Sequence, residues 1–236
     1  MWCTFNGKGL VTSNGTGWGY TAPVNPYNPY NLPPMTIRYM FEDPTYDPSV
    51  SSYVRSVWTR VSSDPNIWDW AQDPQGSQSL DNLFSGDAFG QSSLRVHIIG
   101  ANLQGLSQPS IQSTWYGNPN IVSVHVMDTR TVTDFQSAFA GCSNLYEIAG
   151  LPIQGQAFQM FSGCTGLRRL PRFEASSSVQ VQEMFGGCRN VESGILDCYD
   201  SLRNVPYIYH FACFRDCGVD TPTGAAELAQ IPSDWK

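Results

Sequence analysis

The sequence predicts an α/β solenoid that carries short parallel strands on one face and short helices on the other. Three segments share the pattern Ala or Met, Phe, any residue, Gly, Cys, any two residues, Leu or Val; they are residues 138–145, 160–167 and 184–191. Their phenylalanines, Phe139, Phe161 and Phe185, are 22 and 24 residues apart. A fixed period of this length is typical of chains whose repeats stack on one another.

Weaker copies of the pattern extend the array in both directions. Upstream copies place aromatic anchors at Phe89 and Tyr116, and a downstream copy places one at Phe214. We therefore expect the repeats to occupy residues 79–218 as one elongated unit.

Residues 1–35 are expected to form an extended arm. Four prolines fall within residues 26–34, which excludes helix and central strand and favours a polyproline-like conformation. The arm has too little apolar periodicity to fold on itself, so it is either a tail without fixed structure or a segment that becomes ordered on another subunit. We favour the second interpretation because six aromatic residues could anchor it: Trp2, Phe5, Trp18, Tyr20, Tyr27 and Tyr30.

Residues 36–78 are expected to form a β-rich N-terminal cap. Alternating patterns predict strands over 35–41 and 52–61, with turns at the Asp-Pro pairs between them, and a further strand segment at 67–70. The first repeat of a stack has no neighbour on its outer side. Four apolar residues are expected to cover it: Trp58, Ile67, Trp68 and Trp70.

Each repeat is expected to contain a short helix followed by a short strand. Apolar residues at positions i, i+3 and i+4, as in Phe135, Ala138 and Phe139, lie on one side of a helix. Strands of the leucine-rich-repeat kind are then predicted in segments 94–99, 121–126, 145–148 and 167–170. Residues 219–236 should close the array, with a helix over 225–230 and Trp235 packed against it.

Four cysteines occupy the same position of successive repeats, which indicates a ladder of buried thiols; they are Cys142, Cys164, Cys188 and Cys217. A zinc site is the alternative, built from Cys198, His210, Cys213 and Cys217. Because this set lacks a close ligand pair of the Cys-x2-Cys kind, we expect no metal and no cofactor.

Charge and hydropathy exclude several classes of protein. The net charge is -7, the pI is about 4.8 and charged residues make up only 14% of the chain. An acidic chain is a poor partner for nucleic acid and for anionic membranes. There is no run of about 18 apolar residues that could span a bilayer and no export signal at the N-terminus, so we expect a protein made without a signal peptide and without membrane insertion.

Charged side chains on the predicted strands are candidates for a binding face. Glu147, Arg168, Arg169 and Glu192 would set acid beside base across neighbouring strands, with Tyr146 on the same face. His97 and His125 would lie on successive strands of that sheet. A solvated ladder that only fixes strand register is the alternative, and a hydrolase triad would need His97, His125 or His210.

The unit at 160–167 and 184–191 resembles the BspA-like leucine-rich repeats of bacterial surface proteins and of proteins encoded by phages of gut bacteria. The resemblance covers about residues 80–218 and is looser in the flanking copies, where Gln91 and Asn118 lie in or beside the Cys position. It implies a leucine-rich-repeat solenoid that serves binding and adhesion, with no catalytic residues to transfer.

The repeats are poor in charge and resemble those of adhesins, yet no export signal is present. A phage virion protein would combine these properties, because it is assembled in the host cytoplasm. We therefore expect a non-enzymatic capsid, head-fibre or tail-associated component. The arm would bind other virion proteins, the repeats would contact a host surface protein or glycan, and copies would associate in the particle. A bacterial cell-surface adhesin is the alternative, and an enzyme is a distant third.

Overall fold

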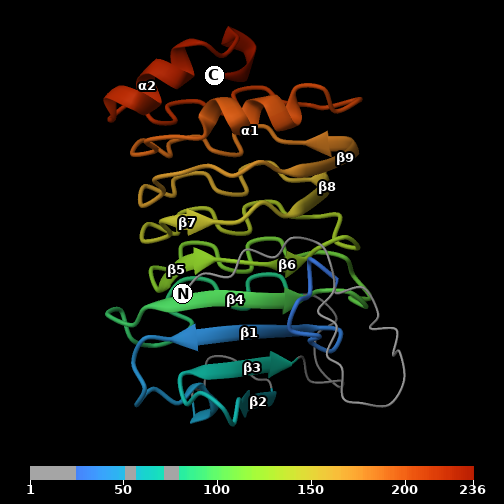
Figure 1. The fold of residues 1–236 in the computed structure, drawn as a ribbon, viewed down its shortest axis with the longest axis vertical. Coiled ribbons are helices and arrows are strands. Elements are labelled where there is room, and N and C mark those ends of the chain that lie inside the picture. The colour runs from blue at the N-terminus through green and yellow to red at the C-terminus, as the bar shows by residue number, and fades with distance from the viewer. Residues whose placement is uncertain (1–24, 51–56, 72–79) are drawn as a thin grey trace, which may run out of the picture.

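The structure is a computed structural model that describes residues 25–50, 57–71 and 80–236 (Figure 1). Its larger sheet has seven strands and its smaller sheet has two. The strands of the larger sheet are β1 (Thr36–Phe41), β2 (Val57–Arg60), β3 (Ile67–Ala71), β4 (Val96–Asn102), β5 (Ile121–Val124), β6 (Met127–Asp128) and β7 (Glu147–Ile148). The other elements are β8 (Pro152–Gln156), β9 (Glu174–Gln180), α1 (Ile195–Leu202), α2 (Pro222–Ala229) and the 3-10 turns Pro48–Val50 and Ser233–Trp235.

The larger sheet is mixed, with the order β2-β3-β1-β4-β5-β7 and β6 paired to β4. The pairs from β2 to β4 are antiparallel, whereas β4, β5 and β7 run parallel. The predicted strands at 35–41 and 67–70 are β1 and β3, and β2 covers the end of the predicted strand at 52–61, whose first part lies outside the described residues. Strands β8 and β9 form a separate parallel pair that the sequence did not predict.

The predicted leucine-rich-repeat solenoid is wrong. A mixed sheet replaces the uniform row of parallel strands, and between β4 and Gly194 the described chain contains turns where a helix was expected in each repeat. The α-helices of the described chain, α1 and α2, both lie near the C-terminus (Figure 1).

Hydrogen bonding explains the missing helices. Alternate N–H groups around each anchor donate to the next layer: Ser137 to Phe158 at 3.1 Å, Phe139 to Met160 at 2.9 Å and Gly141 to Ser162 at 2.8 Å. A helix would use these N–H groups within its own segment. The i, i+3, i+4 spacing therefore places side chains inward from a chain of turns rather than from a helix.

Left-handed residues maintain this turn pattern at two fixed places in each layer. Two positions before the anchor, Ser137, Gln159 and Glu183 have φ of 54°, 55° and 50°. Two positions after it, Gly141 and Gly187 both have φ of 75°. Glycine adopts this region without steric cost, which explains the Gly of the sequence pattern.

Stacked aromatic rings form the centre of the molecule. We call them the aromatic stack: Phe84, Trp115, Phe139, Phe161, Phe185 and Phe214. Neighbouring rings are 4.6 to 6.1 Å apart at their centroids and within 10° of parallel. Two predicted anchors are wrong, because Phe84 and Trp115 take the places expected for Phe89 and Tyr116. Tyr116 is instead 54% exposed.

Both ends of the aromatic stack are covered. At the N-terminal end, Trp70 packs edge-on against Phe84 at 5.4 Å, and Tyr39 accepts a hydrogen bond from Trp115. At the C-terminal end, Trp235 lies 6.2 Å from Phe214. The predicted closing helix is α2, which begins after the N-cap Thr221. Neither α-helix of the described chain is long and apolar enough to cross a membrane.

Candidate functional site

The two predicted strand histidines belong to one hydrogen-bonded chain. His97 Nε2 lies 3.0 Å from Glu42 Oε1, and His97 Nδ1 lies 2.7 Å from Ser123 Oγ. His125 Nε2 lies 2.9 Å from the same hydroxyl. Parallel pairing of β4 with β5 produces this arrangement by placing His97 opposite Ser123.

This Glu-His-Ser arrangement has the residue types of a hydrolase triad but not an available nucleophile. Ser123 is fully buried and its single hydroxyl serves two imidazoles. If His97 donates from Nε2 to Glu42, its Nδ1 accepts from Ser123, and Ser123 accepts from His125. Burial lowers the pKa of His125, partly opposed by Glu147. This hydrogen-bonded series therefore joins β4 and β5 to Glu42, the residue that follows β1, rather than presenting Ser123 to a substrate.

Of the predicted row of alternating acidic and basic side chains, Arg168 and Glu192 form an ion pair. Arg168 lies 3.8 Å from Glu192 in an exposed ion pair, and Arg168 also donates to the Asn190 carbonyl. Arg169 faces Ser193 across a parallel bridge, while Glu147 pairs with Ser123 in the sheet. Since exposed ion pairs contribute about 0–1 kcal/mol, this ladder adds little to stability.

Tyr146 is available on this side of the molecule. Its side chain is 46% exposed, and its N–H donates to Val122 of the preceding layer. Together with exposed Glu147, Arg168, Arg169 and Glu192, it forms a mixed polar surface. The surface is charged and solvated, so complementarity to a partner would depend on charges that salt screens.

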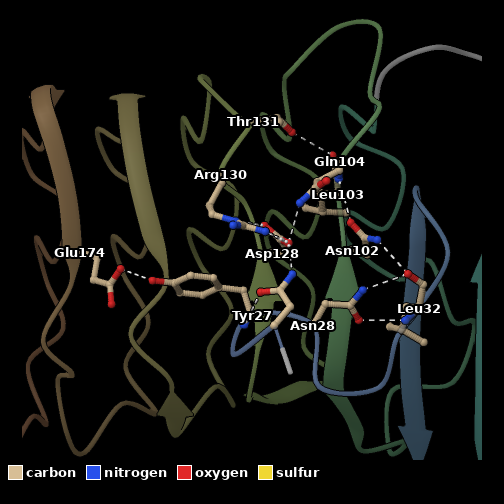
Figure 2. Close-up of polar contacts among 11 residues, drawn as sticks. Tyr27, Asn28, Leu32, Asn102, Leu103, Gln104, Asp128, Arg130, Thr131 and Glu174 are labelled. Carbon is tan, nitrogen blue, oxygen red and sulfur yellow. Dashed lines mark hydrogen bonds and ion pairs between the residues drawn. The ribbon is translucent and has the colours of Figure 1, made fainter. Parts of the chain in front are cut away.

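Of the predicted arm anchors, Tyr27 and Tyr30 lie against this chain itself. Tyr27 donates its hydroxyl to Glu174 of β9, and Arg130 lies 5.2 Å from the centre of its ring (Figure 2). Tyr30 lies on β4, where a Cβ added to Gly100 would come within 2.8 Å of its ring. Trp2, Phe5, Trp18 and Tyr20 lie outside the described residues.

Hydrogen bonds of side-chain amides hold segment 25–32 against β4 and β6 (Figure 2), and we call this set of contacts the tie. Asn28 accepts from the N–H of Leu32 and donates to its carbonyl, closing a turn. Asn102 of β4 donates to that carbonyl at 2.8 Å. Leu32 is 4% exposed, so this part of the predicted arm contributes to the core.

Asp128 is the charged centre of the tie. Its carboxylate is bound by both sides of the Arg130 guanidinium, at 2.9 and 2.7 Å, and receives further hydrogen bonds from Asn25 at 3.0 Å and Gln104 at 2.7 Å (Figure 2). Burial alone raises the pKa of Asp128, but hydrogen bonds from Arg130 and Asn25 outweigh it, so the pKa is lowered. The carboxylate is thereby held charged.

The predicted ladder of buried thiols is confirmed. Cys142, Cys164, Cys188 and Cys217 are buried and unpaired. The first three thiols lie 2.9 to 3.1 Å from the anchor carbonyl of the preceding layer. Burial raises the pKa of Cys142 and Cys188 to about 12, which makes these thiols poor nucleophiles.

The alternative zinc ligands do not form a metal-binding group in the described chain. His210 stacks on Trp235 at 4.1 Å and bonds Asp234, while Cys198 and Cys213 are buried free thiols. No group of three or more potential ligands is present in the described segments.

Two of the shallow grooves on the surface of the described residues have volumes of about 230 and 220 Å³. Glu42 and Arg95 line the first, and Arg130 and Glu174 line the second. Both are smaller than the roughly 300–1,000 Å³ of small-molecule sites.

The structure reveals one surface that the sequence analysis missed. Tyr207, Tyr209 and Phe211 are 89%, 61% and 66% exposed, and we call these three residues the aromatic edge. Alternation of aromatic residues over 207–211 is visible in the sequence and would have indicated a strand-like segment with one aromatic face.

Comparisons with protein-family models, curated proteins and solved structures gave no match.

Proposed function

We propose that this protein is a non-enzymatic binding component of a phage particle. The observation that carries the proposal is the aromatic edge, whose rings are between 61% and 89% exposed. Contiguous exposed apolar groups on a folded protein mark interaction sites. The resemblance of the repeated sequence motif to BspA-like repeats is the ground on which we propose adhesion as the purpose of that interaction.

Two features of the described chain support a binding role over a hydrolytic one. The Glu42-His97-Ser123 chain has its hydroxyl buried, and the ladder thiols have raised pKa values. Both sets of reactive groups contribute to packing between layers. An open aromatic surface suits contact with an extended partner.

In this proposal, anchoring to capsid or tail proteins belongs to the residues before Asn25. Tyr27 and Tyr30 are already engaged with Glu174 and Arg38 of the same chain. The rest of the protein then projects from the particle toward a host surface protein or glycan, with copies associating in the particle.

Mass spectrometry and immunogold labelling of density-purified particles test the proposal. We expect the protein in particles, and we expect labelled protein to adsorb to host cells through the aromatic edge. Detection in host envelopes but not in particles would instead favour a bacterial cell-surface adhesin. A variant that replaces all three aromatic-edge residues by Ala should still fold but adsorb poorly.

A further inference from the structure

The aromatic edge continues the smaller sheet. Tyr209 donates its N–H to Val179 at 3.0 Å and accepts from Val181 at 2.7 Å, which places it beside β9. Bridges then align Gln156 with Gln180, and Gln180 with Tyr209. The exposed side chains of Gln156, Gln180 and Tyr209 thus form one row across three neighbouring segments.

A second row lies beside the first. Ser137 donates to Phe158, Gln159 to Gln182 and Glu183 to Phe211, so that Phe158, Gln182 and Phe211 follow one another across the layers. Gln182 Oε1 is covered and has no hydrogen-bond partner in the described part of the chain. This face therefore carries both aromatic rings and side-chain amides, in the order Gln156, Gln180, Tyr209 in the first row and Phe158, Gln182, Phe211 in the second.

The rings of the aromatic edge have free faces. Among the described residues, no ring–ring pair and no cation–π pair includes Tyr207, Tyr209 or Phe211. By contrast, Arg203 covers Tyr199 at 5.8 Å and Arg38 covers Tyr30 at 5.4 Å. Tyr207 also has a φ of 57°, an uncommon conformation for a bulky residue, and it is the most exposed of the three.

Glu183 and His210 near this face are paired, and Asp134, which bridges Gln156 at the end of the first row, accepts a hydrogen bond from the Gln136 N–H at 3.0 Å. Glu183 binds Arg215 at 2.5 Å, and His210 lies 2.9 Å from Asp234. The other members of the two rows are amides and aromatic groups, which neither attract nor repel ions strongly. A charged partner would therefore find little complementarity here.

From these observations we propose that the face formed by the aromatic edge with Gln156 and Gln180 binds a linear neutral glycan, an inference that rests on the proposed binding function. Neighbouring strands are about 4.8 Å apart, which is close to the length of one pyranose unit. Sugar C–H faces pack on aromatic rings, and amides both donate to and accept from sugar hydroxyls. The row spacing thus offers one contact group to each successive sugar.

Affinity gel electrophoresis of the full chain tests this inference. The gels contain dextran, xyloglucan, galactomannan or yeast mannan, with anionic alginate as the charged comparison. We expect at least one neutral polysaccharide to retard the protein, and we expect replacement of Tyr207, Tyr209 and Phe211 by Ala to raise the Kd about tenfold or more. Tyr116→Ala is the matched control, since Tyr116 is 54% exposed but lies outside the two rows.

Retardation by none of the four neutral polysaccharides, or equal retardation of the triple variant, would overturn the inference. Salt-sensitive retardation by alginate alone would also overturn it, while leaving the proposed binding function intact. Self-association in analytical ultracentrifugation that the triple variant abolishes would assign the face to a second copy of the chain instead. The particle assay above fails or succeeds independently of all these outcomes.

Discussion

At the scale of single residues, the same side chain has opposite roles in different places. Phe161 is fully buried in the aromatic stack, between Phe139 at 5.4 Å and Phe185 at 5.6 Å. Phe211 is 66% exposed. Stacked pairs contribute about 0.5–1.5 kcal/mol beyond the area that they bury. Position within a layer therefore decides whether a phenylalanine stabilises the fold or is available to a partner.

Phe161→Ala is expected to lower the free energy of unfolding by about 3–5 kcal/mol, because it leaves a cavity inside the aromatic stack. Phe211→Ala is the matched control and should change it by less than about 0.5 kcal/mol. Urea unfolding followed by circular dichroism measures both. Equal effects of the two substitutions would contradict the stack as the source of stability.

Ser123→Ala is expected to destabilise the protein by about 1–3 kcal/mol, since it leaves buried His97 Nδ1 without its partner. Ser143→Ala, at an exposed position of the next layer, serves as the control. Chemical denaturation gives the energies, and imidazole NMR shifts of both histidines should move together because they share one hydroxyl. Independent shifts of the two imidazoles would show that His97 and His125 are not coupled through Ser123.

At the scale of elements, turns that are hydrogen-bonded to the neighbouring layers replace the helices that the sequence predicted. The sequence pattern located the layer centres at Phe139, Phe161 and Phe185, and the structure stacks those rings. It could not distinguish a helix from a chain of turns, because both place positions i, i+3 and i+4 inward. The chain of turns differs from a helix in its left-handed residues, such as Gln159 and Glu183. Gln and Glu rarely adopt this conformation, so their presence in the sequence does not predict it.

Helix α1 was missed for a related reason. Ile195, Cys198 and Leu202 have helical spacing, but Gly194 gives the N-cap no side chain. The cap comes instead from Glu227 of α2, which accepts from the N–H of Ile195 at 2.7 Å. Such a long-range cap is invisible to local sequence patterns. The aromatic edge was missed likewise, because exposure depends on which neighbours cover each face.

Gly187→Ala is expected to lower the free energy of unfolding by about 1–2 kcal/mol, because Gly187 has a left-handed φ of 75°. An added Cβ would cause no clash, since its nearest neighbours would lie at an ordinary 3.9 Å, so the whole effect comes from the backbone conformation. Gly187→Asn should cost less, since Asn tolerates this conformation. Asp216 occupies the matching position of the last layer with φ of 56°. Asp216→Gly should therefore keep or raise the melting temperature, and a fall would contradict the role assigned to this position.

At the scale of the whole molecule, one carboxylate connects the N-terminal segment to the central layers. Asp128 receives hydrogen bonds from Asn25, Gln104 and Arg130. Segments more than 100 positions apart are thereby joined, since Asn25 and Asp128 are separated by 103 residues. The integrity of this tie should depend on the charge of Asp128.

Acidification is expected to weaken the tie. The pKa of Asp128 is lowered in the folded protein, so its stabilisation is present above the unfolded value of about 3.9 and is lost as pH falls through the folded value. Asp128→Asn should reduce stability at pH 7 and show a smaller further loss between pH 5 and pH 3 than the unsubstituted protein. Exposed Asp87→Asn is the control, and urea midpoints across this pH range measure all three.

Distances along the chain between members of the aromatic stack vary more than distances between their rings. Phe161 and Phe185 are 24 residues apart, whereas Phe185 and Phe214 are 29 apart and Phe84 and Trp115 are 31 apart. The corresponding ring separations are 5.6, 5.7 and 6.1 Å. The additional residues leave the ring separations almost unchanged, although α1 itself buries Ile195, Cys198 and Leu202 in the core. Evolution or an engineer could therefore graft new peptides between anchors and diversify what the surface recognises, while the buried column stays constant.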